Sequence, residues 1–385
     1  MLKTISLLCM LLVFTGTKRD TTKPIQATEV TINMLPANPI IEHDQYGQYL
    51  NFDISIKNTG THTLELAAIE MSVVDASVKT VVKKTINSNG QSPGIKTLGN
   101  TIIKPGATIS IFNPFYTLTP DIKITFLRYE FFFNYSDSPQ QAENNEHRIP
   151  MDVDVSIEKI VTPRLYIPKT NFTLPLKGKL LVWDGHDFYS HHRRFRIVLP
   201  ERLEKGITAN SNRYACDLVD IDEKGNMYQS DPFKKENWYV FGKPVFAPAG
   251  GIIVEAQNGI PDNEFNGKDV KSPNIPADAD PLGMGNHVII DHGNGEYSVL
   301  LHLEKGSVTV RNGEQVRPGQ KIGNIGFSGD AIFPHLHYAV MDGPKEQVSE
   351  GLPCYFNDFK LYRGSVYIAV KKGRTDSGDI IESEK

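Results

Sequence analysis

The chain has 385 residues, with 41 basic and 45 acidic side chains and a net charge of −4. This length allows two or three domains with sizeable cores, and a composition that is 39% hydrophobic and 22% charged excludes a disordered or membrane-embedded chain. The near balance of charge provides no basic field for nucleic acid, so no nucleic-acid partner is expected.

The first residues have the pattern of a secretory signal. Lys3 precedes the apolar run Ile5–Phe14, which is too short to span a bilayer comfortably, and Thr15–Thr17 supply small residues for cleavage. We therefore predict a signal peptide over residues 1–17 and an exported protein, in the periplasm or at the cell surface. An uncleaved N-terminal anchor is the alternative. No other apolar run is long enough for a transmembrane span.

Residues 25–165 show strand patterns and no clear helical periodicity. Leu50–Ile56 alternates apolar and polar residues, and Leu64–Val74, Thr108–Phe112 and Ile124–Phe131 are further runs rich in β-branched or aromatic residues. Several short strands at this spacing predict an immunoglobulin-like β-sandwich.

The character of the chain changes near residue 165. Residues 166–372 are rich in glycine and histidine and predict a second all-β domain, with its core at about 240–345 and a hairpin around His292–Gly295. Residues 373–385 are polar, and we expect them to form a frayed tail.

Two cysteines, Cys216 and Cys354, follow the predicted signal segment. An exported protein could pair them. Sequence does not show whether they come within bonding distance, so two separate buried thiols are the alternative.

Chemistry is concentrated in the stretch Pro334-His335-Leu336-His337-Tyr338. In a strand, His335 and His337 would point to one face, so that one imidazole could bind a metal while the other acts on water or an oxyanion beside it. Asp217 far upstream and His302 between them complete a constellation that suits a zinc hydrolase. Hydrolysis is therefore the leading hypothesis.

These residues and their neighbours resemble a known family. The pieces that carry the resemblance are, in chain order, Ala247–Gly251, Val288–Gly293, Tyr297–Leu303, Val316–Gly323 and Ser328–His337. Their order and spacing are similar to the core domain of the M23 zinc metallopeptidases, the LytM- or lysostaphin-like peptidoglycan hydrolases. The resemblance implies a LytM-like antiparallel β-sheet peptidase domain, a bound Zn²⁺ and peptidoglycan peptides as substrate. The predicted sandwich lies outside it.

In that family, the zinc ligands are the His and Asp of an H-x-x-x-D motif and the second His of H-x-H. The resemblance implies that Asp217 and His337 are metal ligands and that His302 and His335 assist catalysis. This chain departs from the pattern at the first ligand, where Arg213 stands. A guanidinium does not deprotonate to bind a metal. If residues 213 to 217 form a strand, Arg213 points into the site and could pair with Asp217.

Another residue would then have to supply the missing ligand. His191 and His192 lie about one strand and one loop upstream of Asp217, and we favour His192. Other M23-like sequences are similar in combining R-Y-A-x-D with an upstream His. Cys216 is disfavoured because strand alternation places it on the face opposite to Asp217. A surface loop with basic flanks is the alternative for the histidine pair.

Three further histidines are assigned to the framework. We expect His186 to be a turn residue, with metal contact as the less favoured alternative, and we expect structural roles for His287 and His292.

Three functions remain open. The first is a zinc-dependent endopeptidase that hydrolyses peptide cross-links of peptidoglycan, with His335 or His302 taking the proton of water. The second, which Arg213 favours, is a degenerate, non-catalytic M23-like domain that binds cell wall or regulates another hydrolase. A metallopeptidase with a protein substrate is the third. An Arg213–Asp217 ion pair would support the second function, and His191 or His192 beside Asp217 and His337 would support the first.

Overall fold

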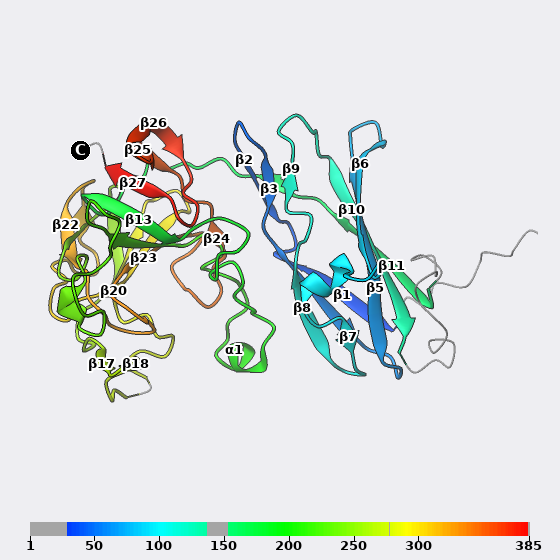
Figure 1. Cartoon of the computed structure of the whole chain (residues 1–385), viewed down its shortest axis with the longest axis horizontal. Coiled ribbons are helices and arrows are strands. Elements are labelled where there is room, and N and C mark those ends of the chain that lie inside the picture. The colour runs from blue at the N-terminus through cyan, green and yellow to red at the C-terminus, as the bar shows by residue number, and fades with distance from the viewer. Residues whose placement is uncertain (1–28, 137–152, 277, 384–385) are drawn as a thin grey trace, which may run out of the picture.

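The computed structural model describes residues 29–136, 153–276 and 278–383. The predicted signal peptide lies outside the described residues. Two β-rich lobes follow one another along the chain (Figure 1). Within the described ranges, no helix has the length and apolar character needed to cross a membrane.

The N-terminal lobe is a β-sandwich, as predicted. One sheet has the strand order β1-β4-β8, a second has β11-β10-β5-β6 with β7 beside β5, and β12-β2-β3-β9 forms a third. Ile54, Met71 and Phe131, from strands of the first two sheets, are buried in one common core. The strands are β1 (Val30–Leu35), β2 (Ile40–His43), β3 (Gln48–Leu50), β4 (Asp53–Asn58), β5 (Leu64–Val74), β6 (Thr80–Asn87), β7 (Ile102–Ile103), β8 (Thr108–Phe112), β9 (Thr117–Leu118), β10 (Phe126–Tyr135), β11 (Val155–Val161) and β12 (Arg164–Leu165).

The predicted strands of this lobe agree with the structure to different degrees. Leu64–Val74 and Thr108–Phe112 coincide with β5 and β8. The run Leu50–Ile56 is divided, because β3 pairs with β2 and β9 whereas β4 pairs with β1 and β8 in another sheet. The change of sheet at Asn51 and Phe52 leaves no strand continuous across them.

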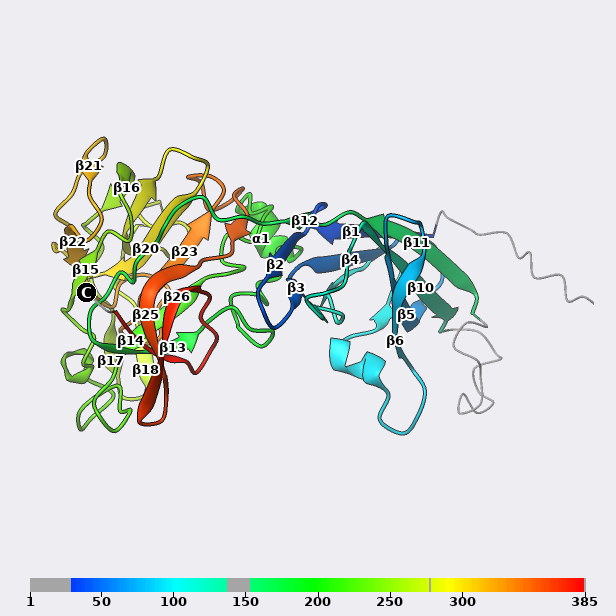
Figure 2. The ribbon, with the colours of Figure 1, turned by 90° about the horizontal axis from the view of Figure 1, so that it is seen from above.

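The second lobe is built on an eleven-stranded antiparallel sheet with the order β21-β16-β19-β20-β23-β14-β13-β27-β25-β26 and β24 beside β23. Figure 2 shows β20 and β23 running side by side in this lobe. The predicted hairpin around His292–Gly295 joins β19 and β20. The strands are β13 (Lys179–Asp184), β14 (Cys216–Asp220), β15 (Pro244–Phe246), β16 (Gly251–Gln257), β17 (Glu264–Asn266), β18 (Asp269–Lys271), β19 (Asn286–Asp291), β20 (Tyr297–Leu303), β21 (Gln315–Val316), β22 (Lys321–Asn324), β23 (Leu336–Met341), β24 (Gly351–Leu352), β25 (Phe356–Arg363), β26 (Val366–Gly373) and β27 (Ile380–Ser383).

Helical structure is limited to short turns in the residues that the structure describes. The α-helix α1 (Pro200–Glu204) lies between the two lobes in both views (Figures 1 and 2). Two 3-10 helices span Gly94–Leu98 and Lys235–Asn237. The all-β fold class predicted from the sequence is therefore confirmed.

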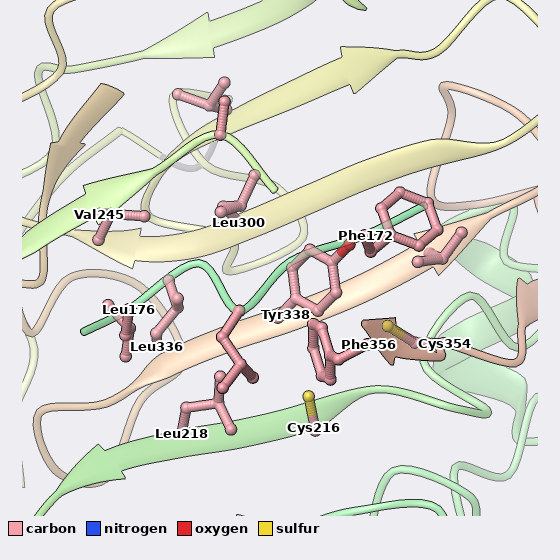
Figure 3. Close-up of a cluster of buried hydrophobic side chains, with 14 of the residues drawn as sticks. Phe172, Leu176, Cys216, Leu218, Val245, Leu300, Leu336, Tyr338, Cys354 and Phe356 are labelled. Carbon is pink, nitrogen blue, oxygen red and sulfur yellow. The ribbon is translucent and has the colours of Figure 1, made fainter. Parts of the chain in front are cut away.

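A cluster of apolar side chains covers one face of the large sheet (Figure 3). Leu218 on β14, Leu300 on β20 and Leu336 on β23 contribute to it. Cys216 and Cys354 lie in the same cluster as free, fully buried thiols, so the chain has separate thiols here and no disulfide between them. Burial raises the pKa of both thiols, which keeps them protonated and unreactive.

The expectation of a frayed C-terminal tail is wrong. Strand β27 lies between β13 and β25 and pairs with both, and Ile381 is fully buried. The prediction was based on the polar composition of these residues. A polar segment can nevertheless form a strand when strands on both sides satisfy its backbone groups. The burial of one side chain, Ile381, then determines which face of β27 points toward the core.

The two lobes are in direct contact. Glu42 on β2 lies 3.3 Å from Nδ1 of His186, with both side chains buried. His186, predicted as a turn residue, therefore joins the lobes and belongs to neither of the candidate metal-binding groups found in the described residues.

Candidate metal centre

Two adjacent strands bring the first pair of site residues together. In the register of β14 and β23, Asp217 lies opposite His337, and in that of β23 and β20, His337 lies opposite Leu301. Directly opposite residues of antiparallel strands have side chains in contact range, and here His337 Nδ1 lies 3.2 Å from Asp217 Oδ1. His302 follows Leu301 on β20, so three neighbouring strands supply Asp217, His337 and His302.

Arg213 does not point into this site, contrary to the expectation from strand alternation. The strand begins only at Cys216, and Arg213 lies in the turn before it. Its buried guanidinium pairs with Glu350 and with Asp53 of the sandwich. The prediction for Arg213 was wrong because side chains alternate between two faces only inside a strand. Alternation holds for Cys216, which is in the core on the face opposite to Asp217.

His192 reaches the site from a loop that follows β13. The carboxylate of Asp184, the last residue of β13, accepts hydrogen bonds from Ser190 Oγ at 2.7 Å and from the backbone N–H groups of His191 and His192, both at 3.3 Å. The loop therefore folds back over the strand end. His192 Nδ1 lies 2.7 Å from Asp184 Oδ2, and His192 Nε2 lies 3.5 Å from Asp217 Oδ1.

His191 occupies the outer edge of the same loop. Its side chain is 59% exposed, and its Nε2 lies 4.0 Å from Asp217 Oδ2. Its Nδ1 lies 3.0 Å from Asp184 Oδ2. Of the two neighbouring histidines, the buried His192 is the one that joins the tight group with Asp217 and His337.

The donor set around Asp217 suits a cation. Nitrogens of His192, His335 and His337 lie 3.5, 3.4 and 3.2 Å from the single oxygen Oδ1 of Asp217. In a neutral His192 with its proton on Nδ1, beside the charge of Asp184, Nε2 presents a lone pair to the Asp217 carboxylate, which also only accepts. A metal ion between them removes this repulsion. Two imidazoles and one carboxylate with an open side are a common catalytic zinc set, and an acidic residue behind a ligand histidine is its usual support.

Backbone carbonyls fix the tautomers of the other two histidines. His335 Nδ1–H donates to Phe333 O at 2.8 Å, and His302 Nδ1–H donates to Ser328 O at 2.9 Å. A carbonyl can only accept, so Nε2 is the free nitrogen of each neutral ring. The rings lie 4.9 Å apart between centroids. His302 has a φ of 64°, a strained value for a side chain of this size that is characteristic of functional sites.

The histidines of the cluster differ in the direction in which their surroundings shift the pKa. Burial would raise the pKa of Asp217, but the imidazoles of His192 and His335 hold that pKa well below its ordinary value. Burial lowers the pKa of His302, as do the neighbouring His335 and His337. Burial likewise lowers the pKa of His337 to about 4, so this imidazole is neutral and free to act as a ligand. His335 differs, because the charge of Asp217 outweighs its burial and raises its pKa.

A cleft of about 430 Å³ opens above these groups. Its floor is polar and carries His192, Asp217, His302, His335 and His337, while Trp183, Phe333 and Ile332 are among the apolar lining residues. The ring of Phe333 stacks on Trp238 and meets Trp183 edge to face, so this wall is fixed by aromatic packing.

Sequence reasoning missed Asp184, which contacts both loop histidines. The available signal was its position: an acidic residue at the end of the apolar run Leu180–Trp183, followed by Gly185.

Two other expectations agree with the structure. His287 and His292 are tied to backbone carbonyls of Gly285 and Gly250 and lie outside the cluster.

Comparison with known proteins finds a family match for part of this chain. Residues 239–349 match the family described as Peptidase family M23. This part of the chain is an M23 peptidase domain. The matched stretch of the M23 domain includes His302, His335 and His337, whereas His192 and Asp217 precede it.

Two curated relatives that match part of this chain are named as peptidases. A peptidoglycan DD-endopeptidase, ShyA, of Vibrio cholerae is 44% identical over 100 residues, which are 26% of this chain and 18% of the relative. A DD-carboxypeptidase/endopeptidase, Mpg, of Neisseria meningitidis is 42% identical over 73 residues, which are 18% of this chain and 16% of the relative. The chain thus spans less than a fifth of the length of these two relatives.

Among solved structures, the catalytic domain of lysostaphin from Staphylococcus simulans is similar, with 23% identity and a TM-score of 0.21. The match covers 33% of this chain and 86% of that domain.

Proposed function

We propose that the protein is an exported, zinc-dependent metalloendopeptidase that hydrolyses peptide cross-links of bacterial peptidoglycan. The observation that carries the proposal is the convergence of His192, Asp217 and His337, from a loop and two strands, with possible ligand atoms within 4.8 Å of one another in a cleft. Zn²⁺ held there would polarise a substrate carbonyl and lower the pKa of water.

The side chains of this site would have separate roles in positioning the ligands and in proton transfer. Asp184 orients the His192 ring, and β14 and β23 hold Asp217 and His337 in register. The free Nε2 of His335 is placed to take a proton from water and return it to the leaving amine. His302, whose Nδ1–H is bound to Ser328 O and whose pKa is lowered by burial, would present a free Nε2 beside His335 as a second proton acceptor.

The position of Arg213 supports an enzyme over a degenerate, non-catalytic domain. An Arg213–Asp217 ion pair would have filled the ligand site, but Arg213 pairs with Asp53 and Glu350 instead. The name of the relative ShyA, a peptidoglycan DD-endopeptidase, supports peptidoglycan peptides as the substrate. The cleft, with a volume of about 430 Å³ and both polar and apolar lining residues, has room for part of a peptide substrate.

The test is zinc content together with hydrolysis of purified peptidoglycan. We expect near-stoichiometric zinc and release of cross-link fragments from the wild type, and loss of both in His337→Ala. His43→Ala, an exposed histidine of the sandwich, is the matched control and should behave as wild type. Wild-type protein that binds no zinc after reconstitution would overturn the proposal.

Export is a separate part of the proposal, and it rests on the N-terminal pattern of Lys3 and the apolar run Ile5–Phe14. Mass spectrometry of the protein purified from the envelope or the medium should give a mature N-terminus near residue 18. An intact Met1 in cytoplasmic protein would contradict export without affecting the hydrolase.

A further inference from the structure

The loop that carries His192 is held on its far side by the N-terminal sandwich. Arg193 and Arg194 directly follow His192 and turn away from the cleft. The buried guanidinium of Arg193 lies 4.4 Å from the ring centroid of Phe188 and 5.3 Å from that of Tyr116, a residue of the sandwich. Arg194 lies 4.8 Å from the ring centroid of Phe112 on β8. Desolvated cation–π contacts of this kind are stabilising.

Arg193 depends on these aromatic contacts. Burial lowers its pKa to about 10, and none of its three guanidinium nitrogens has a hydrogen-bond partner in the described residues. Tyr116 and Phe188 stack on each other with their centroids 4.3 Å apart, so one aromatic ring from each lobe contributes to the surface that receives Arg193. Moving the sandwich would remove Tyr116 from this pair.

A second connection runs through hydrogen bonds. The side-chain amide of Asn210 donates to the backbone carbonyl of His192 at 3.2 Å. The backbone N–H of Asn210 donates to Glu350 Oε2 at 3.3 Å, and Glu350 Oε1 accepts from Nε of Arg213. Arg213 in turn donates from Nη1 to Asp53 Oδ2 at 3.2 Å and from Nη2 to Leu35 O at 3.1 Å. Asp53 and Leu35 belong to the sandwich.

We propose that the N-terminal sandwich positions the ligand His192, with Arg213 and Asp53 as positioning residues that act through Glu350 and Asn210. This inference rests on the proposed function, because it concerns metal binding at His192, Asp217 and His337. Each link of the path is buried or partly buried, so the contacts are not screened by water. Removing the Asp53 charge would leave the buried Arg213 guanidinium only partly compensated. The guanidinium would then be expected to shift and to change the position of Glu350.

The test is the zinc Kd of the full chain, measured by competition with a chromophoric chelator. Groups bonded directly to a metal ligand typically change metal affinity 10–100-fold, and Asp53 acts on His192 through three intervening residues, so Asp53→Asn should weaken zinc binding by up to about tenfold. Asp53→Glu, which keeps the charge, should restore most of the affinity. Asp44→Asn is the matched control, because Asp44 also lies in the sandwich and pairs across to Arg374 but does not reach Asn210. Its zinc Kd should equal that of the wild type.

Tyr116→Leu tests the aromatic connection independently and covers the case in which Asp53→Asn does not fold by circular dichroism. It should also weaken zinc binding. The visible spectrum of the Co²⁺-substituted protein gives a second readout, since a displaced His192 changes the ligand field whereas a purely structural loss of stability does not. Wild-type zinc affinity in folded Asp53→Asn and Tyr116→Leu would overturn the inference. A wild type that binds no zinc would instead overturn the proposed function.

Discussion

The carboxylate of Asp184 contacts the imidazole of His192 from the side opposite to Asp217, with Oδ2 2.7 Å from Nδ1. Nε2 of the same ring faces Asp217 at 3.5 Å. The two carboxylates thus lie at the two nitrogens of one imidazole, and the nearer charge, that of Asp184, favours a proton on Nδ1, which leaves Nε2 free to bind.

Asp184→Asn should therefore weaken zinc binding about 10–100-fold while leaving the stoichiometry at saturation unchanged. An amide in place of the carboxylate can donate to Nδ1 and so favour the wrong tautomer. Competition titration with a chelator measures the change. Asp187→Asn, in the same loop but bonded to backbone N–H groups of Tyr189 and Ser377, is the control and should bind zinc as the wild type does. Equal affinities for the two variants would remove Asp184 from the site.

His192→Ala and His191→Ala separate the two neighbouring histidines. His192 is buried in the group with Asp217 and His337, whereas His191 is exposed. We expect His192→Ala to lose stoichiometric zinc on dialysis and His191→Ala to retain it, as measured by atomic emission. The reverse result would assign the ligand to His191 and contradict the geometry.

His335→Ala should lower the rate of hydrolysis without changing metal binding. The free Nε2 of His335 faces Asp217 Oδ1, but His335 is outside the tight ligand group. Loss of a general base typically costs about 10²–10⁴-fold in rate, so hydrolysis of a cross-linked peptide should fall by that factor. Zinc content should stay at the wild-type level. A variant that loses zinc in parallel with activity would show that His335 holds the metal.

Glu346 makes the stability of the protein depend on pH. Burial raises the pKa of this cleft residue to about 7, and its Oε2 has no hydrogen-bond partner in the described residues. The unfolded chain loses the proton near pH 4.3, so between about pH 4.3 and 7 the folded state binds more protons and its stability falls as pH rises. The loss is complete above pH 7 and is at most about 4 kcal/mol.

Urea unfolding at pH 5 and pH 8 tests this effect. Glu346→Gln should be more stable than the wild type at pH 8, and the difference between the two proteins should shrink at pH 5. Glu236→Gln, at an exposed position, should follow the wild type at both values. A constant difference between Glu346→Gln and the wild type would contradict the shifted pKa.

Local patterns predicted the fold well where they coincide with one continuous strand. Alternation and β-branched residues located Leu64–Val74, and glycines marked the turn at His292–Gly295. The same reasoning failed at Ile380–Ser383, because strand formation there depends on β13 and β25 as partners and not on local composition.

The candidate site was predictable in part for a similar reason. Asp217, His302, His335 and His337 occupy motifs with fixed spacing, and the structure brings them into one cleft. The place of Arg213 could not be predicted, since its partner Asp53 is 160 residues away. Arg213 lies in the turn before β14 and contacts that distant carboxylate, and local strand alternation carries no information about such a contact. Asp184 was missed because its importance appears only when the loop after it folds back.

The position of β27 has a consequence for how the protein is made. This strand fills the space between β13 and β25, so the sheet cannot close until residue 383 has left the ribosome. Strand β13 ends in Asp184, the residue that steadies His192. Until synthesis passes β27, the nascent chain therefore has an open sheet edge at β13, the strand that leads into the loop of His192.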